Sequence, residues 1–298
     1  MRAPTVSPAI DAVRQDWPNL TGRRRFRWGV QWRAIDLWGP AAFLAFLVIV
    51  CFVIPLVGHI PSPISGNVLN VNLPLFSRGH LLGTDPQGYD ELSRLLYGGR
   101  ISIEVGVGSV ALSLTVGGTL GGLAGLRGGR FESVVMRILD VLLAFPALIL
   151  AVTISSYFGA SELNVIWAIG FVFTAAFGRL ARAQALSVRQ RTFVLAARLN
   201  GQNDRKIFFR HIVPNIIPNL VTFGVLLVGV AIGLEAAISY LGAGVPPPGP
   251  SWGNMINLGQ TYITLNPRLI IVPSAALFLT ITALNLLSDA LRSRWATT

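Results

Sequence analysis

Four carboxylates lie in or at the ends of strongly apolar stretches of this chain, namely Glu104, Asp140, Glu235 and Asp289. An unpaired charge at the middle of a bilayer is costly, so each of these side chains should face protein or water. Arg137 stands three residues before Asp140, and a helix places residues at that spacing on one face. We therefore expect a structural ion pair there rather than a substrate contact, and we expect the same of Asp289 and Arg292.

Glu235 lies towards the outer end of its apolar run, just before a segment rich in proline and glycine. A carboxylate at such a place can line a polar path across the membrane or pair with a neighbouring subunit. The residues leave both alternatives open for Glu235, and likewise for Glu104.

The sequence contains no arrangement of residues that predicts catalysis. No Gly-x-x-x-x-Gly-Lys-Ser/Thr loop occurs, so the chain is not expected to hydrolyse ATP by that route. None of the three histidines lies beside a candidate nucleophile, and the single Cys51 lies inside an apolar run. His211 has no second histidine or cysteine nearby, so we expect it to form hydrogen bonds rather than to bind a metal.

The elements that hold these residues are predicted to be membrane-spanning helices. Hydrophobic residues make up 52% of the 298 residues, charged residues only 12%, and the mean hydropathy is +0.61. Soluble domains carry about 25% charged residues. A spanning helix needs about 20 mostly apolar residues, and six stretches qualify: 38–60, 101–126, 133–158, 162–180, 212–240 and 267–288. The net charge of +11 does not indicate nucleic-acid binding, because the basic residues fall between these stretches.

The distribution of arginine and lysine orients the helices, because cytoplasmic loops carry an excess of both. With the N-terminus inside, the inner segments hold 20 of the 24 basic residues and the outer segments hold 4. This places the tails 1–37 and 292–298 and a polar island at 192–215 in the cytoplasm. The loops 61–100 and 241–266 are then outside.

Local patterns subdivide these segments. Asp85 before Pro86 has the residue types of a helix start, so a short amphipathic helix is expected within 61–100. The loop 241–266 is too rich in proline and glycine for a regular helix and should be ordered by Trp252 and its neighbours. In the second span, glycines four residues apart predict close packing against another helix; they are Gly117, Gly121 and Gly125, and Gly118 and Gly122.

The island from Thr192 to Asn215 is polar and basic although its surroundings are apolar. Phe193–Asn200 can form about two helical turns ended by Gly201, whose missing Cβ permits a left-handed stop. A second helix is expected from Asp204 into the fifth span. A short helix between two longer ones suits docking into a groove of another protein, whereas the alternative is an ordinary solvated loop; the spacing alone favours neither.

The order of residues in the island resembles the E-A-A loop of ABC importer permeases, which reads E-A-A-x-x-x-G followed by a spaced I, H and L-P-N. Leu195 stands where that family has the acidic residue, and Val213 replaces leucine. The resemblance implies that the loop forms a coupling helix on a nucleotide-binding subunit. The coupling residues that it implies are Phe193, Val194, Ala196, Ala197, Asn200, Gly201, Ile207, His211, Pro214 and Asn215. Because the acid is missing, docking should depend on shape and apolar contact more than on that charge.

Further segments resemble the C-type permeases of dipeptide, oligopeptide and nickel importers. They are L-G-T-D-P-Q-G-Y-D (82–90), M-R-I-L-D with F-P (136–146), E-A-A-I-S-Y-L-G-A-G-V-P-P-P-G-P-S-W-G-N-M (235–255) and N-L-L-S-D-A-L-R (285–292). The resemblance covers roughly 38–295 and implies an all-α integral membrane protein with six transmembrane helices, in the type I ABC importer (MetI-like) permease fold. The core permease domain is expected at 101–291, after the first transmembrane helix at 38–60.

The resemblance also implies the setting in which the chain works, a bacterial cytoplasmic (inner) membrane. The implied partners are a second homologous permease, one or two P-loop ATPase subunits that bind ATP and magnesium, an extracytoplasmic substrate-binding protein and membrane lipid. No cofactor is expected in this chain itself. The expected cargo is dipeptides or oligopeptides, with a nickel complex, glutathione or haem as alternatives. A secondary transporter that works alone is the rival class, but no internal repeat supports it.

Overall fold

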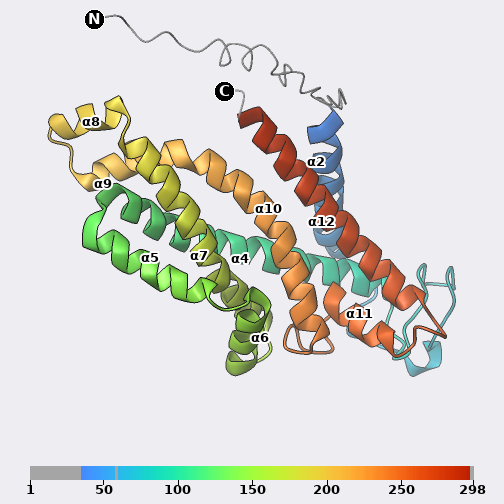
Figure 1. Ribbon diagram of the computed structural model, residues 1–298. Coiled ribbons are helices and arrows are strands. Elements are labelled where there is room, and N and C mark those ends of the chain that lie inside the picture. The colour runs from blue at the N-terminus through green and yellow to red at the C-terminus, as the bar shows by residue number, and fades with distance from the viewer. Residues whose placement is uncertain (1–34, 58–59, 296–298) are drawn as a thin grey trace, which may run out of the picture. The chain divides into compact units, whose positions relative to one another are not determined.

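The structure is a computed structural model that describes residues 35–57 and 60–295, and this part of the chain is helical without named strands. Five helical segments are long and apolar enough to cross a membrane. They are the run of α2 (Ile35–Val48), η1 (Ile49–Val53) and α3 (Ile54–Val57), then α4 (Glu91–Arg127), α7 (Glu162–Arg189), the run of α9 (Asp204–Ile207), η3 (Phe208–Ile212) and α10 (Val213–Tyr240), and α12 (Arg268–Trp295). Figure 1 shows their order along the chain.

The third expected span is broken. Instead of one helix over 133–158, the chain forms α5 (Gly129–Leu143) and α6 (Ala147–Phe158), which are bent by 88° relative to each other. Pro146 explains the break, because proline has no N–H to donate and disfavours helical backbone at the residue before it. The structure has the predicted six membrane spans only if α5 and α6 together count as one span.

The second span starts earlier than expected and has no separate amphipathic helix before it. The structure has one continuous α4 of 37 residues, whose N-cap is Asp90: the side chain accepts a hydrogen bond from the Ser93 N–H at 2.7 Å. Asp85 does not start a helix. Its Oδ1 instead accepts from the N–H groups of Gln87 and Tyr89, both at 2.9 Å, which closes a turn.

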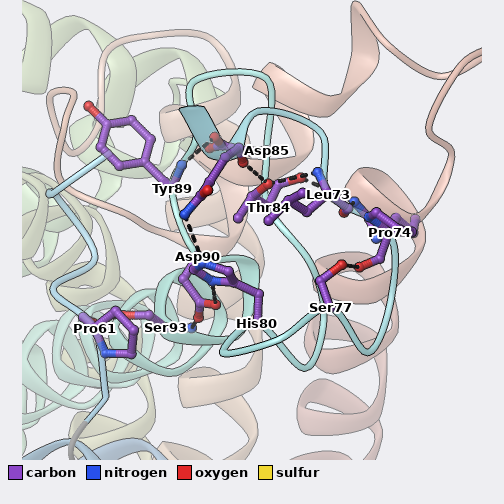
Figure 2. A network of polar contacts seen from close by, with 12 residues as sticks. Pro61, Leu73, Pro74, Ser77, His80, Thr84, Asp85, Tyr89, Asp90 and Ser93 are labelled. Carbon is purple, nitrogen blue, oxygen red and sulfur yellow. Dashed lines mark hydrogen bonds and ion pairs between the residues drawn. The ribbon is translucent and has the colours of Figure 1, made fainter. Parts of the chain in front are cut away.

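The segment 60–90, which the charge distribution predicts to lie outside and which we call the outer segment, contains one short helical turn, η2 (Val68–Asn70), and is otherwise irregular. Buried polar contacts hold it together (Figure 2). His80 Nδ1 lies 2.7 Å from Asp90 Oδ2, and the Ser93 hydroxyl donates to the Pro61 carbonyl at 2.6 Å. Arg268, the first residue of α12, donates to the Thr84 carbonyl at 3.1 Å. The segment is thereby fixed to the N-terminal ends of α4 and α12.

The glycines of α4 allow the closest helix packing in the bundle. α4 and α7 make the most extensive contact between any two elements of the described chain. A Cβ on Gly121 would overlap the backbone of Gly178, and one on Gly117 or Gly125 would meet the α7 backbone in the same way. Gly122 faces Phe208 on another side of α4. The predicted close packing is confirmed for Gly117, Gly121 and Gly125, whereas a Cβ on Gly118 would make only ordinary contacts.

The loop after α10 contains a helix that the sequence did not predict, α11 (Trp252–Gln260). Ser251 caps it by accepting from the Asn254 N–H at 3.2 Å. Trp252 is buried, and its indole N–H donates to the Leu95 carbonyl at 3.0 Å. The prediction that Trp252 orders this loop is therefore confirmed, although the prediction of no regular helix is wrong for its second half.

Candidate functional site

The island at 192–215 folds as a short helix with a glycine stop, as expected. Helix α8 covers Thr192–Leu199, and Gly201 follows it with φ of +72°. The Gly201 N–H donates to the Arg198 carbonyl at 2.9 Å and the Gln202 N–H donates to the Ala197 carbonyl at 3.1 Å. This pair of bonds is the Schellman motif, which favours glycine at the left-handed position. Helix α9 then begins at Asp204, but its cap is Asn203, not Asp204.

Helix α8 has a buried face and an exposed face. Val194 and Ala197 are buried in the main hydrophobic core together with Ile207. These three expected coupling residues therefore hold the helix in place and are not available to a partner. Phe193, Ala196 and Asn200 are exposed.

The exposed face of α8 carries two leucines four residues apart. Leu195 is 48% exposed and Leu199 is 89% exposed. Residues at this spacing lie on one side of a helix. Leu199 is not among the residues expected from the sequence, although its spacing of four from Leu195 indicates the same helix face. Exposed apolar side chains that lie next to each other on one helix face can mark a surface that another protein covers.

His211 connects α8 to the start of α10. Its Nε2 lies 3.3 Å from the Gln202 side-chain oxygen, and its ring centroid lies 6.0 Å from that of Phe193. The Asn215 side chain donates to the His211 carbonyl at 2.7 Å. Pro214, in the first turn of α10, is exposed. His211 thus forms hydrogen bonds within the loop, as predicted, and it contacts two other expected residues, Phe193 and Asn215.

Two arginines join this region to the C-terminal end of α4. Arg189 donates to the carbonyls of Leu126 and Gly125, at 3.2 and 3.4 Å, and Arg198 donates to the Leu126 carbonyl at 3.4 Å. The last carbonyls of a helix have no partner within the helix and carry partial negative charge, so cations are favoured there. Helix α8 is therefore attached to α4 by hydrogen bonds as well as by the core.

A shallow depression that is open over most of its surface lies near α8, at the start of the fifth span, and we call it the cationic groove. It has a volume of about 640 Å³ and is lined by Asn203, Arg205, Lys206, Phe209 and Arg210. The same side chains are exposed. The region therefore offers an apolar surface on α8 and a cationic groove on α9 and η3.

The intramembrane charges pair differently from the prediction. Asp140 accepts from Arg179 of α7 at 2.6 Å, and no ion pair joins it to Arg137 on its own helix. Arg182 of α7 binds Glu132 of α5 in the same way, with Nε 2.6 Å from Oε1. Both pairs line a groove of about 820 Å³ between α5 and α7. Both carboxylates of α5 therefore pair with arginines of the neighbouring helix α7 and not with an arginine of α5 itself.

The C-terminal pair and Glu235 also differ from the expectation. Within residues 60–295, no ion pair joins Asp289 to Arg292. Glu235 has no exposed surface, and its two oxygens accept hydrogen bonds from the hydroxyls of Ser102 and Ser239, both at 2.7 Å. It connects α10 to α4 inside the chain, so it lies at neither a path surface nor a subunit surface here. Glu104 is partly exposed and pairs with Arg100 at 2.8 Å.

Comparison with known families matches residues 117–295 to the model described as the binding-protein-dependent transport system inner membrane component. The glutathione transport system permease protein GsiD of Pectobacterium atrosepticum is 42% identical over 216 residues, which is 72% of this chain and 72% of that protein. The protein of the same name from Escherichia coli O6:K15:H31 is 36% identical over 289 residues, 97% of this chain and 92% of that protein. The dipeptide transport system permease protein DppC of Alkalihalophilus pseudofirmus is 36% identical over 216 residues, 72% of this chain and 71% of that protein.

Among solved structures, a chain of the MetNI methionine ABC transporter, described as inward facing, has a similar fold. The TM-score is 0.55 at 16% sequence identity, with 67% of this chain and 95% of that chain covered. At this identity the likeness concerns the fold alone. It confirms the predicted all-α, MetI-like architecture.

Proposed function

The chain belongs to the family of binding-protein-dependent transport system inner membrane components, and we propose that it forms half of the path of a peptide importer and couples to ATPase subunits through α8. As a permease of an ABC importer it is a transporter subunit without an ATPase site of its own. A polypeptide of this family needs the energy of ATP hydrolysed in partner subunits. Two points are proposed: which surface of this chain contacts the ATPase subunits, and which compounds are transported.

The observation that carries the proposal is the arrangement of α8. Its outer face presents Leu195 and Leu199, while Val194 and Ala197 anchor its inner face in the core. Apolar side chains at the centre of an interface, in a pocket of the partner, supply much of its binding energy. The partner for this surface is an ATPase subunit whose groove accepts the two leucines. Leu195 stands where the family usually has an acidic residue, and a leucine suits an apolar contact from which water is excluded.

Movement of α8 has a direct route into the bundle. Arg198 connects it to the last turn of α4, and α4 packs along α7 through the glycines. Closely packed helices move as rigid bodies rather than deform. When the ATPase subunits close on ATP and magnesium, they displace α8, and the helices attached to it rearrange the path. ATP and magnesium are bound by those partners only.

The proposed assembly contains this chain, a second homologous permease, one or two P-loop ATPase subunits and an extracytoplasmic substrate-binding protein, in a bacterial inner membrane. The excess of arginine and lysine in the segments 127–137 and 179–210 supports a cytoplasmic position for α8 and for both termini. The exposed third of the Glu104 side chain is available to the path or to the second permease.

Dipeptides and oligopeptides are the proposed cargo. Glutathione is the second candidate, because relatives named for glutathione transport align with up to 97% of the length of this chain. Competition between dialanine, trialanine and glutathione for uptake by reconstituted transporter decides between them. Peptide uptake that stays the same in an excess of glutathione supports dipeptides and oligopeptides as the cargo.

The coupling surface is tested with the double substitution Leu195→Ser and Leu199→Ser in the complete transporter. We expect the ATPase subunits to be lost on purification and ATP-driven uptake to fall by at least about tenfold, as for two interface anchors. The matched control is Leu163→Ser, which removes an exposed leucine at the other end of α7. Full uptake by the double variant, or uptake by the native chain in liposomes without ATPase subunits, contradicts the proposal.

A further inference from the structure

The cationic groove beside α8 has charges that the fold does not use. Arg205 and Lys206 lie on α9, and Arg210 lies on η3. None of the three takes part in an ion pair within residues 60–295. The carboxylate of Asp204, at the start of the same short helix, lies 3.8 Å from Arg198 instead. Three cations therefore surround one groove without an anion from the chain.

The groove continues into an apolar stripe on α10. Arg210, Pro214, Ile217 and Val221 follow one another at spacings of four, three and four, which keeps them on one face of a helix. All four are exposed. The polar Asn215 and Asn219 lie on a different face, where Asn219 donates to Gln184 of α7 at 2.9 Å. The stripe is thus an apolar surface that no other helix of the described chain covers.

The position of groove and stripe fits the boundary of a membrane. α9, η3 and α10 together form one candidate span, Asp204–Tyr240, and the groove lies in its first two turns. The ends of a span lie among lipid headgroups and its middle lies in hydrocarbon. Phe209, which is 61% exposed, lines the groove at this boundary. The charges therefore come before the apolar stripe along this span, which is the order in which a helix entering a membrane meets headgroups and then acyl chains.

The geometry points to a binding site for an anionic phospholipid, with its phosphate in the groove of Arg205, Lys206 and Arg210 and an acyl chain along Pro214, Ile217 and Val221. A phosphate accepts charge-assisted hydrogen bonds from arginine and lysine. Basic pockets at the end of a membrane helix attract anionic lipid. A soluble phosphate would use the groove and leave the stripe uncovered, and an acidic protein surface would not extend into hydrocarbon. A lipid occupies both.

The test uses the full chain in detergent and native mass spectrometry with phosphatidylglycerol and phosphatidylcholine of identical acyl chains. The native chain should bind phosphatidylglycerol about tenfold more tightly. The triple substitution Arg205→Gln, Lys206→Gln and Arg210→Gln should reduce this preference to about twofold or less. The matched control is Arg137→Gln, Arg191→Gln and Arg292→Gln, which removes the same charge from exposed arginines elsewhere and should keep the preference.

Three results overturn the site. The first is an unchanged preference in the groove variant or an equal loss in the control. The second is binding of glycerol 3-phosphate as tight as that of phosphatidylglycerol, which makes the groove a site for soluble phosphate. The third is a groove variant that keeps lipid but no longer retains the ATPase subunits, which assigns the cations to the coupling interface. The site does not depend on the proposed cargo, so its failure leaves the importer function untouched.

Discussion

Arg198 of α8 donates a hydrogen bond to the carbonyl oxygen of Leu126, in the last turn of α4, at 3.4 Å. This bond links the surface proposed for the ATPase to the helix that packs along α7. Replacing Arg198 with alanine leaves Leu195 and Leu199 in place, so ATPase subunits should still assemble. Uptake per ATP hydrolysed should fall by about three- to tenfold, as for the loss of one ordinary hydrogen bond. Uptake and phosphate release measured in the same proteoliposomes give this ratio.

The control for this prediction is Arg191→Ala, which removes an exposed arginine from the same loop. That variant should keep the native ratio. Loss of ATPase subunits in Arg198→Ala would show that the arginine contributes to docking and not to transmission.

Gly201 should resist substitution for a conformational reason alone. Its φ is +72°, and nothing lies within 4 Å of a Cβ built on it. A left-handed conformation costs a non-glycine residue about 1–2 kcal/mol. Gly201→Ala should therefore reduce coupled ATP hydrolysis, and Gly201→Asn should reduce it less, because asparagine tolerates this conformation better. Equal activity of the two variants would point to a steric cause.

Gly121 and Gly118 lie three residues apart on α4 but differ in their surroundings. A Cβ at Gly121 would overlap the Gly178 backbone, whereas one at Gly118 would meet only ordinary contacts at 3.7 Å. Gly121→Ala should destabilise the chain by about 1–3 kcal/mol through overpacking. Gly118→Ala should be close to neutral. Thermal unfolding in detergent measures both, and a similar loss in both variants would mean that helix flexibility matters more than packing.

Asp85 gives the outer segment a pH dependence. Burial raises the pKa of Asp85, and hydrogen bonds from the backbone N–H groups of Tyr89 and Gln87 and the charge of Arg94 oppose the rise only in part. The folded chain therefore holds this proton more tightly than the unfolded chain. The carboxyl contributes stability below its ordinary pKa, and the contribution is lost as the pH rises through the folded-state value.

Asp85→Asn keeps the Oδ1 acceptor for the turn and removes the charge. Its midpoint of thermal unfolding should exceed that of the native chain at about pH 8, and the gain should vanish near pH 4, about the ordinary pKa of this group. Asp85→Ala removes the acceptor and should lower the midpoint at every pH. A gain for Asp85→Asn that grows as the pH falls would contradict the assignment.

The sequence predicted those features that depend on local pattern. Hydropathy located the spans, glycine spacing located the α4–α7 contact, and Gly201 located the end of α8. It did not predict partners that come from distant segments. Asp85 and Asp90 are both plausible caps by residue type, and the contact of Asp90 with His80 is visible only in the fold. The sequence predicted that Asp140 pairs with Arg137, the nearest arginine along the chain, whereas in the structure Asp140 pairs with Arg179.

Hydropathy also cannot register the break in the third span. The residues from Ala144 to Pro146 are apolar, so the composition over 133–158 is that of a continuous helix. The bend arises from backbone geometry at Pro146. Similarly, the burial of Glu235 against Ser102 depends on the approach of α10 to α4, because the two residues lie far apart in sequence.

Helix α4 is about 55 Å long at 1.5 Å per residue, whereas the hydrocarbon core of a bilayer is about 30 Å thick. Its first turn is bonded to the outer segment through Asp90 and Ser93, and its last turn is bonded to α8 through Leu126. The glycine contact with α7 lies between these ends. In the proposed importer, a tilt of α4 as a rigid body would move both of these attachments together, so a displacement of α8 would reach the opposite end of the helix without any change within it.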